Sequence, residues 1–131
     1  MNIRVYYEDT DCGNVVYYAN YLKYMERSRT EFLREKGIDL SNYQKNNILF
    51  AVIEANIKYR APARYNDLLD VQSVCTEITS ATVGFDTLIK NQSGILLVKG
   101  SVRLACMSPD GRARRIPEEI RKALSNSLTA I

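Results

Sequence analysis

The chain begins with a period-two pattern of hydrophobic and polar positions. Ile3, Val5 and Tyr7 alternate with Arg4 and Tyr6, and such alternation is typical of a half-buried strand. The sequence therefore predicts a short first strand that ends at the acidic residues following Tyr7.

After Gly13 and Asn14 the period changes to that of a helix. The predicted helix runs from about Ala19 to Lys36, and Gly37 is a residue type that commonly ends helices. Its apolar face is expected to carry residues that recur every three or four positions: Tyr21, Met25, Ser28 and Phe32.

The second half of the chain reads as successive strands. After a polar connector over residues 41–47, alternation predicts strands over residues 53–61, 69–75, 83–89 and 96–106. Pro117 then favours the first turn of a terminal helix that extends to about Leu128. This order predicts an α+β fold in which one long helix packs on one antiparallel sheet. One helix covers a five-stranded sheet poorly, so we also expect self-association.

Length and composition indicate a single soluble domain over residues 1–131. The hydrophobic fraction is 46% and the charged fraction is 25%, which is ordinary for a globular protein. The net charge of +3 suits an anionic ligand but is too weak to favour nucleic acid. No apolar run is long enough for a membrane span or a signal peptide, so a cytoplasmic location is expected. The three cysteines form no CxxC pattern, which favours free thiols.

The absence of histidine restricts the chemistry most strongly. The chain contains no histidine, which excludes Ser-His-Asp and Cys-His catalysis and leaves no credible zinc site. Glycine-rich nucleotide-binding loops are also missing. If the protein is an enzyme, a carboxylate, tyrosine, thiol, lysine or backbone dipole must carry the reaction.

One acidic segment is the strongest candidate for that chemistry. Residues 7–21 read YEDTDCGNVVYYANY, and residues 26–29 read ERSR. These motifs, with YRAPARYND at residues 59–67 and RIP at residues 115–117, resemble the 4-hydroxybenzoyl-CoA thioesterase family of hotdog-fold acyl-CoA thioesterases, and within it the Tol-Pal-associated YbgC type. The resemblance covers nearly the whole chain.

The resemblance implies a five-stranded antiparallel sheet wrapped around one central helix, and hydrolysis of an acyl-CoA thioester without metal or cofactor. It assigns Asp11 as nucleophile or general base, and the backbone N–H of Tyr18 as the group that polarises the carbonyl. By the same resemblance, Tyr7, Gly13 and Val16 are expected to line the site. Several YbgC-type sequences carry histidine at the position of Tyr18. The backbone role does not depend on that side chain, whereas a role of the side chain as a proton shuttle is not expected for tyrosine.

Basic residues are expected to hold the phosphates of CoA, although a solvated surface explains any one of them equally well. The candidates are Lys58, Arg60, Arg64, Lys90, Arg112, Arg114 and Arg115. The family resemblance also implies a dimer or dimer of dimers (a homotetramer), with sites at subunit interfaces and a place in lipid metabolism.

Simpler interpretations exist for the acidic segment and its neighbours. Asp11 is also a residue type that caps helices, and Glu8 and Asp9 are expected to be solvated or hydrogen-bonded within the loop. Cys12 beside carboxylates is expected to be an ordinary loop residue. Glu26 is a second candidate carboxylate, but an ion pair with Arg29 one turn later explains it more simply.

Two other functions stay open at the level of sequence. One is a thioesterase acting on acyl carrier protein. The other is a non-hydrolytic module that binds acyl thioesters and is linked to envelope or phospholipid machinery.

Overall fold

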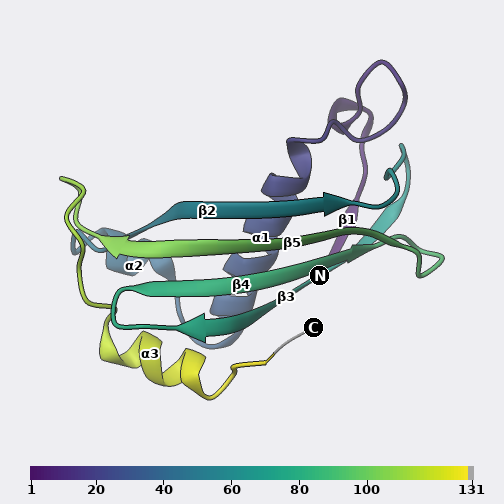
Figure 1. Cartoon of the computed structure of the whole chain (residues 1–131). Coiled ribbons are helices and arrows are strands. Elements are labelled where there is room, and N and C mark those ends of the chain that lie inside the picture. Colours follow the sequence, from purple (N-terminus) through teal and green to yellow (C-terminus); the bar gives the residue numbers. More distant parts are fainter. Residues whose placement is uncertain (130–131) are drawn as a thin grey trace.

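The computed structural model describes residues 1–129 and consists of one antiparallel sheet packed against a long helix (Figure 1). The sheet has the spatial order β1-β3-β4-β5-β2. Its strands are β1 (Asn2–Arg4), β2 (Leu49–Tyr59), β3 (Leu68–Ile78), β4 (Thr82–Lys90) and β5 (Leu96–Met107). The helix is α1 (Asn20–Glu35), followed by the short α2 (Leu40–Gln44), and α3 (Glu118–Ser125) comes last. The α+β fold with five strands and one central helix is confirmed.

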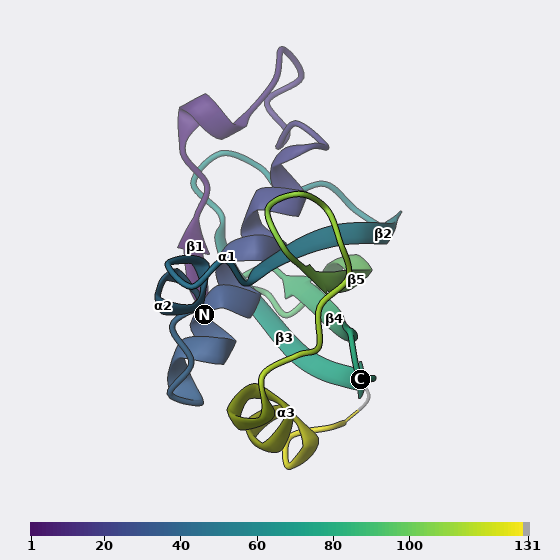
Figure 2. The same ribbon diagram turned by 90° about the vertical axis from the view of Figure 1, so that its left-hand side faces the viewer.

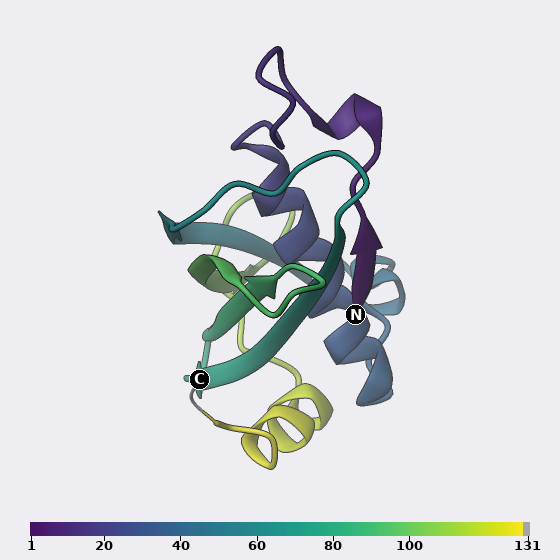
Figure 3. The ribbon, with the colours of Figure 1, turned by 90° about the vertical axis from the view of Figure 1, so that its right-hand side faces the viewer.

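The sheet curves around α1, as the two side views show (Figures 2 and 3). Because side chains alternate between the two faces of a strand, β3, β4 and β5 each direct one set of residues toward α1, and these are buried. The set includes the residues predicted from the alternation: Leu69, Val71, Ser73, Cys75, Val83, Phe85, Thr87, Ile89, Val98, Val102, Leu104 and Cys106. From α1, the side chains of Tyr21, Tyr24, Met25, Ser28 and Leu33 are buried.

The Met25 side chain of α1 packs directly against the backbone of β5 at Gly100. A Cβ atom on Gly100 would lie 2.5 Å from Cε and 2.7 Å from Sδ of Met25, whose side chain is fully buried. Real Cβ contacts are not that short, so the missing side chain at Gly100 makes the space into which Met25 packs.

Three elements differ in extent from the sequence-based expectation. The first strand ends at Arg4, and Tyr7 instead begins a 3-10 turn, η1 (Tyr7–Asp9), with its side chain exposed. The polar connector contains α2, because the Asp39 side chain accepts a hydrogen bond from Ser41 N at 3.0 Å and thereby caps a helical turn. The terminal helix ends at Ser125, before Leu128.

Strand β2 departs from the predicted alternation at Ile53. The register with β5 shifts between Val52 and Glu54, so Ile53 is the extra residue of a bulge and does not share the face of Ala55 and Ile57. On the face toward α1, Val52 and Tyr59 remain about half exposed, although the Tyr59 ring lies 5.6 Å from the ring of Tyr21 of α1. The predicted uncovered surface therefore lies on β2.

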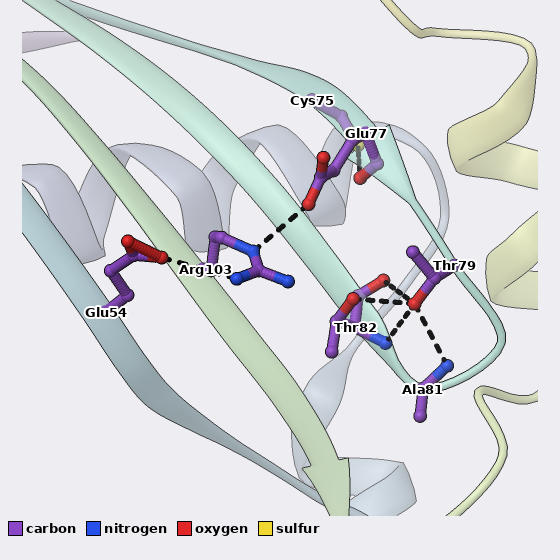
Figure 4. Close-up of polar contacts among 7 residues, drawn as sticks. All are labelled: Glu54, Cys75, Glu77, Thr79, Ala81, Thr82 and Arg103. Atoms are coloured by element: carbon purple, nitrogen blue, oxygen red, sulfur yellow. Dashed lines mark hydrogen bonds and ion pairs between the residues drawn. The ribbon is translucent and has the colours of Figure 1, made fainter.

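The opposite face of the sheet is polar and carries an ion network (Figure 4). Arg103 of β5 contacts Glu54 of β2 at 3.3 Å and Glu77 of β3 at 3.1 Å. Gly84 of β4 lies between Arg103 and Glu77 in the register; its missing side chain lets the arginine reach across. At the end of this hairpin, the Thr79 hydroxyl accepts from Thr82 N at 2.9 Å. A charged face of this kind is suited to water rather than to packing.

None of the helices within residues 1–129 has the length and apolar character of a membrane span.

Replacing Gly100 by alanine should destabilise the protein by about 1–3 kcal/mol, the usual cost of overpacking a core. The added methyl group would collide with the end of the Met25 side chain. Chemical denaturation measures the loss, and the double variant G100A/M25L should recover part of it, because leucine is shorter. Wild-type stability of the single variant would show that the helix does not need this close approach.

Candidate active site

The acidic segment forms a tight loop at one end of α1. Thr10 and Val16 form an antiparallel bridge, and Asp11 N donates to Val15 O at 2.9 Å. Asn14 adopts a positive φ of 60°, a conformation that asparagine tolerates better than most residues. In Figure 1 this loop stands clear of the sheet beyond the start of α1.

The Asp11 carboxylate is oriented by the loop but remains open to solvent. Its Oδ1 atom accepts a hydrogen bond from Gly13 N at 2.8 Å, while Oδ2 has no protein donor within residues 1–129. A Cβ atom on Gly13 would lie 3.3 Å from Oδ1, so a larger residue would crowd the carboxylate. Asp11 therefore presents one held oxygen and one free oxygen, which is suitable for attack or for activating water.

Asp9 has a structural role in the same loop. Its Oδ2 atom accepts from Tyr6 N at 2.8 Å. Its carbonyl oxygen accepts from Tyr17 N and from Asn20 Nδ2, both at 2.9 Å. Asp9 thereby ties the loop to the first residue of α1, in agreement with the expectation of loop hydrogen bonding. Glu8 is exposed, and its side chain makes no hydrogen bond in the described part of the chain.

The backbone N–H of Tyr18 is an unpaired donor next to the start of α1. In the described chain, no acceptor pairs with this N–H, whereas Tyr18 O accepts from the Tyr59 hydroxyl at 3.3 Å. Ala19 follows at the N-cap position of α1. Unpaired N–H groups and the positive end of a helix dipole favour negative charge at such a position.

An open groove of about 330 Å³ adjoins Tyr18. It is lined by Val16, Tyr18, Tyr21, Tyr59, Arg60, Ala61 and Pro62. At its base, the buried Tyr21 hydroxyl accepts a hydrogen bond from Ala63 N at 3.0 Å. Burial raises the pKa of this hydroxyl, and the charges of Asp67 and Asp11 raise it further. Sequence reasoning did not place Tyr59 in a groove, because its pattern only indicated a strand.

The structure brings Arg60 and Arg64 to this end of the molecule. Arg60 lines the groove, and Arg64 forms a bridge with Val15 of the acidic loop. Val16 is buried beside them, and its backbone N donates to Ala63 O at 2.8 Å.

Tyr7 lies outside this groove. It is exposed and contacts Tyr65 edge to face, with ring centroids 5.9 Å apart, in a separate hollow that also includes Arg4 and Asn66. Its proposed place beside Asp11 stays a prediction.

The other predicted basic residues lie away from Asp11 within one chain. Lys58 lies opposite Lys99 in the strand register, and the neighbouring pair Ile57 and Gly100 faces α1. Because side chains alternate between the faces of a strand, Lys58 lies on the face turned away from α1. The segment with Arg112, Arg114 and Arg115 lies at the other end of β2, where Arg114 Nη1 donates to Asn47 O at 3.2 Å. Ten residue steps along β2 correspond to about 33 Å, so these arginines cannot reach the Asp11 of their own chain.

The remaining candidates have plain structural roles. Cys12 is an exposed loop thiol, while Cys75 is buried, and burial raises the pKa of the Cys75 thiol to about 11. The expected ion pair between Glu26 and Arg29 is not formed; Glu26 Oε1 instead accepts from the Thr30 hydroxyl at 2.9 Å. Among residues 1–129, no three His, Cys, Asp or Glu side chains gather closely enough to hold a metal ion.

The chain is similar to known thioesterases over most of its length. The family model of the thioesterase-like superfamily matches residues 5–124. The acyl-CoA thioester hydrolase YbgC of Escherichia coli O6:H1 is 36% identical over 119 residues, which cover 90% of this chain and 89% of that protein.

Two solved structures share the fold over nearly the whole chain. A hypothetical protein, TT1821 from Thermus thermophilus, superimposes with a TM-score of 0.91 at 33% identity, covering 97% of both chains. The 1,4-dihydroxy-2-naphthoyl-CoA thioesterase Slr0204 from Synechocystis gives a TM-score of 0.89 at 23% identity, covering 96% of this chain and 94% of that one. The latter likeness concerns the fold alone. The chain therefore belongs to the thioesterase-like superfamily, as a hotdog-fold protein of the YbgC acyl-CoA thioesterase type.

Proposed function

We propose that this protein hydrolyses acyl-CoA thioesters to a free acid and CoA, with Asp11 as the reacting carboxylate. The observation that carries the proposal is the presence of two reactive groups at the same end of α1. One is the Asp11 carboxylate, which is held by Gly13 N and keeps one oxygen free. The other is the unpaired N–H of Tyr18.

The proposed reaction begins when the thioester carbonyl oxygen accepts a hydrogen bond from Tyr18 N–H. Negative charge develops on this oxygen as the carbonyl carbon is attacked, and the N–H and the α1 dipole stabilise it. Asp11 acts either as the nucleophile, forming an acyl-aspartate that water then hydrolyses, or as a general base on the attacking water. Both routes break the carbon–sulfur bond and release CoA as its thiol, and neither requires histidine.

The free edge of β2 supports a dimeric site. Within residues 1–129 no strand pairs with its outer edge, and Val52 and Tyr59 are about half exposed on the face toward α1. If two β2 strands pair antiparallel across a two-fold axis, the start of one strand lies beside the end of the other. The segment with Arg112 and Arg115 would then approach the partner's acidic loop, about one strand length from its own. Assembly in this way would place basic side chains where the phosphates of CoA extend from the groove.

The two other functions are distinguished by direct assay. Acyl-CoA and acyl carrier protein that bear the same acyl chain separate the two hydrolase hypotheses. Tight ligand binding without turnover on either carrier would favour the non-hydrolytic binding module. The free oxygen of Asp11 favours hydrolysis.

Asp11→Asn should slow hydrolysis of acyl-CoA by at least ~10²-fold, because an amide is a poor nucleophile and base. The amide oxygen can still accept from Gly13 N, so the loop and substrate binding should persist. Single-turnover thiol release measures the chemical step. Glu8→Gln is the matched control, since Glu8 makes no side-chain hydrogen bond in the described chain, and it should keep near wild-type rate. Asp9→Asn should cost far less in rate than Asp11→Asn, because the amide oxygen can still accept from Tyr6 N and the Asp9 carbonyl is unchanged. Near wild-type turnover in Asp11→Asn would contradict the assignment.

Tyr18→Phe should keep most of the activity, because the assigned donor is the backbone N–H and the side chain is exposed. Tyr18→Pro removes that donor and should lower kcat by about 10²-fold or more, as loss of one oxyanion donor does elsewhere. Circular dichroism checks that α1 is intact in the proline variant. An equal loss in the phenylalanine variant would show that the hydroxyl takes part in the reaction.

Mixed dimers test whether two chains build each site. One chain carries Asp11→Asn, and the other carries Arg112→Glu with Arg115→Glu. In a shared site, each mixed dimer has one intact site of two and therefore about half of wild-type activity. In a one-to-one mixture about half of the dimers are mixed, so the mixture should recover to about a quarter of wild type. Each parent alone should be impaired, the arginine variant mainly through KM. No recovery on mixing, or a monomer by light scattering at micromolar concentration, would overturn the shared site.

A further inference from the structure

A second cavity lies on the inner side of the sheet, between the C-terminal half of α1 and the two short helices. Its volume is about 170 Å³. Phe50 near the start of β2 and residues of α3 line it. The loop between η1 and α1 lies beyond the other end of α1, as Figures 1 and 2 show. Six elements each contribute an apolar wall residue: Leu33, Leu40, Phe50, Phe85, Leu104 and Leu124.

One side of this cavity is polar and carries a positive charge without a partner. Glu26, Arg29 and Thr30 of α1 line it. The Glu26 carboxylate accepts a hydrogen bond from Thr30, while the guanidinium of Arg29 has no hydrogen bond or ion pair within residues 1–129. Arg29 is largely withdrawn from solvent, and this burial lowers its pKa, although the charge of Glu26 acts in the opposite direction.

A partly buried guanidinium without an acceptor is unfavourable, because the lost hydration is not replaced. A ligand carboxylate matches its planar donors in the two-bonded manner that arginine favours. The apolar walls require the rest of the ligand to be compact. For scale, an apolar cavity of about 150 Å³ in another protein holds benzene.

We propose that this cavity binds a small free carboxylic acid whose apolar body has about six carbon atoms, with its carboxylate on Arg29. The charge requirement distinguishes such a ligand from the acyl part of a simple thioester, which carries no anion. Within one chain the site is also separate from the groove at Tyr18, with which it shares no lining residue.

Calorimetric titration of the full-length protein with benzoate and with hexanoate tests the proposal. Saturable binding at millimolar concentration or below is expected, and the tighter of the two probes identifies an aryl or an alkyl body. Benzyl alcohol and hexan-1-ol, which lack the charge, should bind more weakly by about tenfold or more. Equal binding of acids and alcohols would overturn the role of Arg29.

Variants then locate the bound acid. Arg29→Gln should weaken binding by at least about tenfold, whereas the matched control Arg27→Gln, an exposed arginine outside the cavity, should not. Glu26→Gln should tighten binding, because a nearby negative charge is removed. Val83→Leu adds a carbon to the cavity wall, and it should also weaken binding while the protein stays folded.

The result is independent of hydrolysis. Asp11→Asn should bind both acids as the wild type does. If Asp11→Asn abolishes binding while Arg29→Gln and Val83→Leu leave it unchanged, the acid occupies the hydrolytic site and the proposal is wrong. Absence of saturable binding for both acids would also overturn it, even if acyl-CoA is hydrolysed.

Discussion

The packing of α1 into the curved sheet is the constraint on which the rest of the structure depends. Met25 fills the space left by the missing side chain of Gly100, and the strand faces around this contact form the core. With the helix fixed there, its N-terminus projects at one edge of the sheet, beside the loop between Thr10 and Val16. A helix end exposes unpaired N–H groups, so the packing that forms the core also delivers the donor of the proposed active site.

The three carboxylates of the acidic segment have different surroundings despite their closeness in sequence. Asp9 has a structural role: its side chain accepts from Tyr6 N, and its carbonyl oxygen accepts from Tyr17 N and from Asn20, the first residue of α1. Glu8 points to solvent. Asp11 is held by one oxygen and open at the other. The backbone donors Tyr6 N and Gly13 N therefore help to offset the repulsion among these charges.

The two faces of the sheet have different surroundings: the outer face is in contact with water, and the inner face packs against the rest of the protein. The outer face carries the network of Arg103 with Glu54 and Glu77, and exposed ion pairs of this kind contribute little to stability. The inner face is buried along β3, β4 and β5, whereas on β2 the side chains of Val52 and Tyr59 remain about half exposed. The unpaired edge and the uncovered apolar face thus coincide on one strand, and this coincidence is why we place the proposed dimer contact there.

The sequence by itself determined the fold class and the order of its elements, because alternation along β3, β4 and β5 and helical spacing along α1 are local consequences of burial on one face. It also singled out Asp11, Gly13 and Tyr18 through a long motif. The bulge at Ile53 could not be predicted from the sequence. The alternation of apolar and polar residues continues through Ile53, although Ile53 has no partner in the pairing with β5. The cap that forms α2 was missed because a five-residue helix leaves almost no periodic signal.

Only the tertiary structure decided which groups meet. Arg64 and the acidic loop are distant in sequence but bridge in space, whereas Arg112 and Arg115 are separated from that loop by the length of β2. Glu26, the predicted partner of Arg29, accepts a hydrogen bond from Thr30 instead. The charge of Arg29 therefore lies beside a cavity that could not be predicted from residue spacing. Such outcomes depend on how distant segments pack, and packing is a property of the assembled core rather than of any one segment.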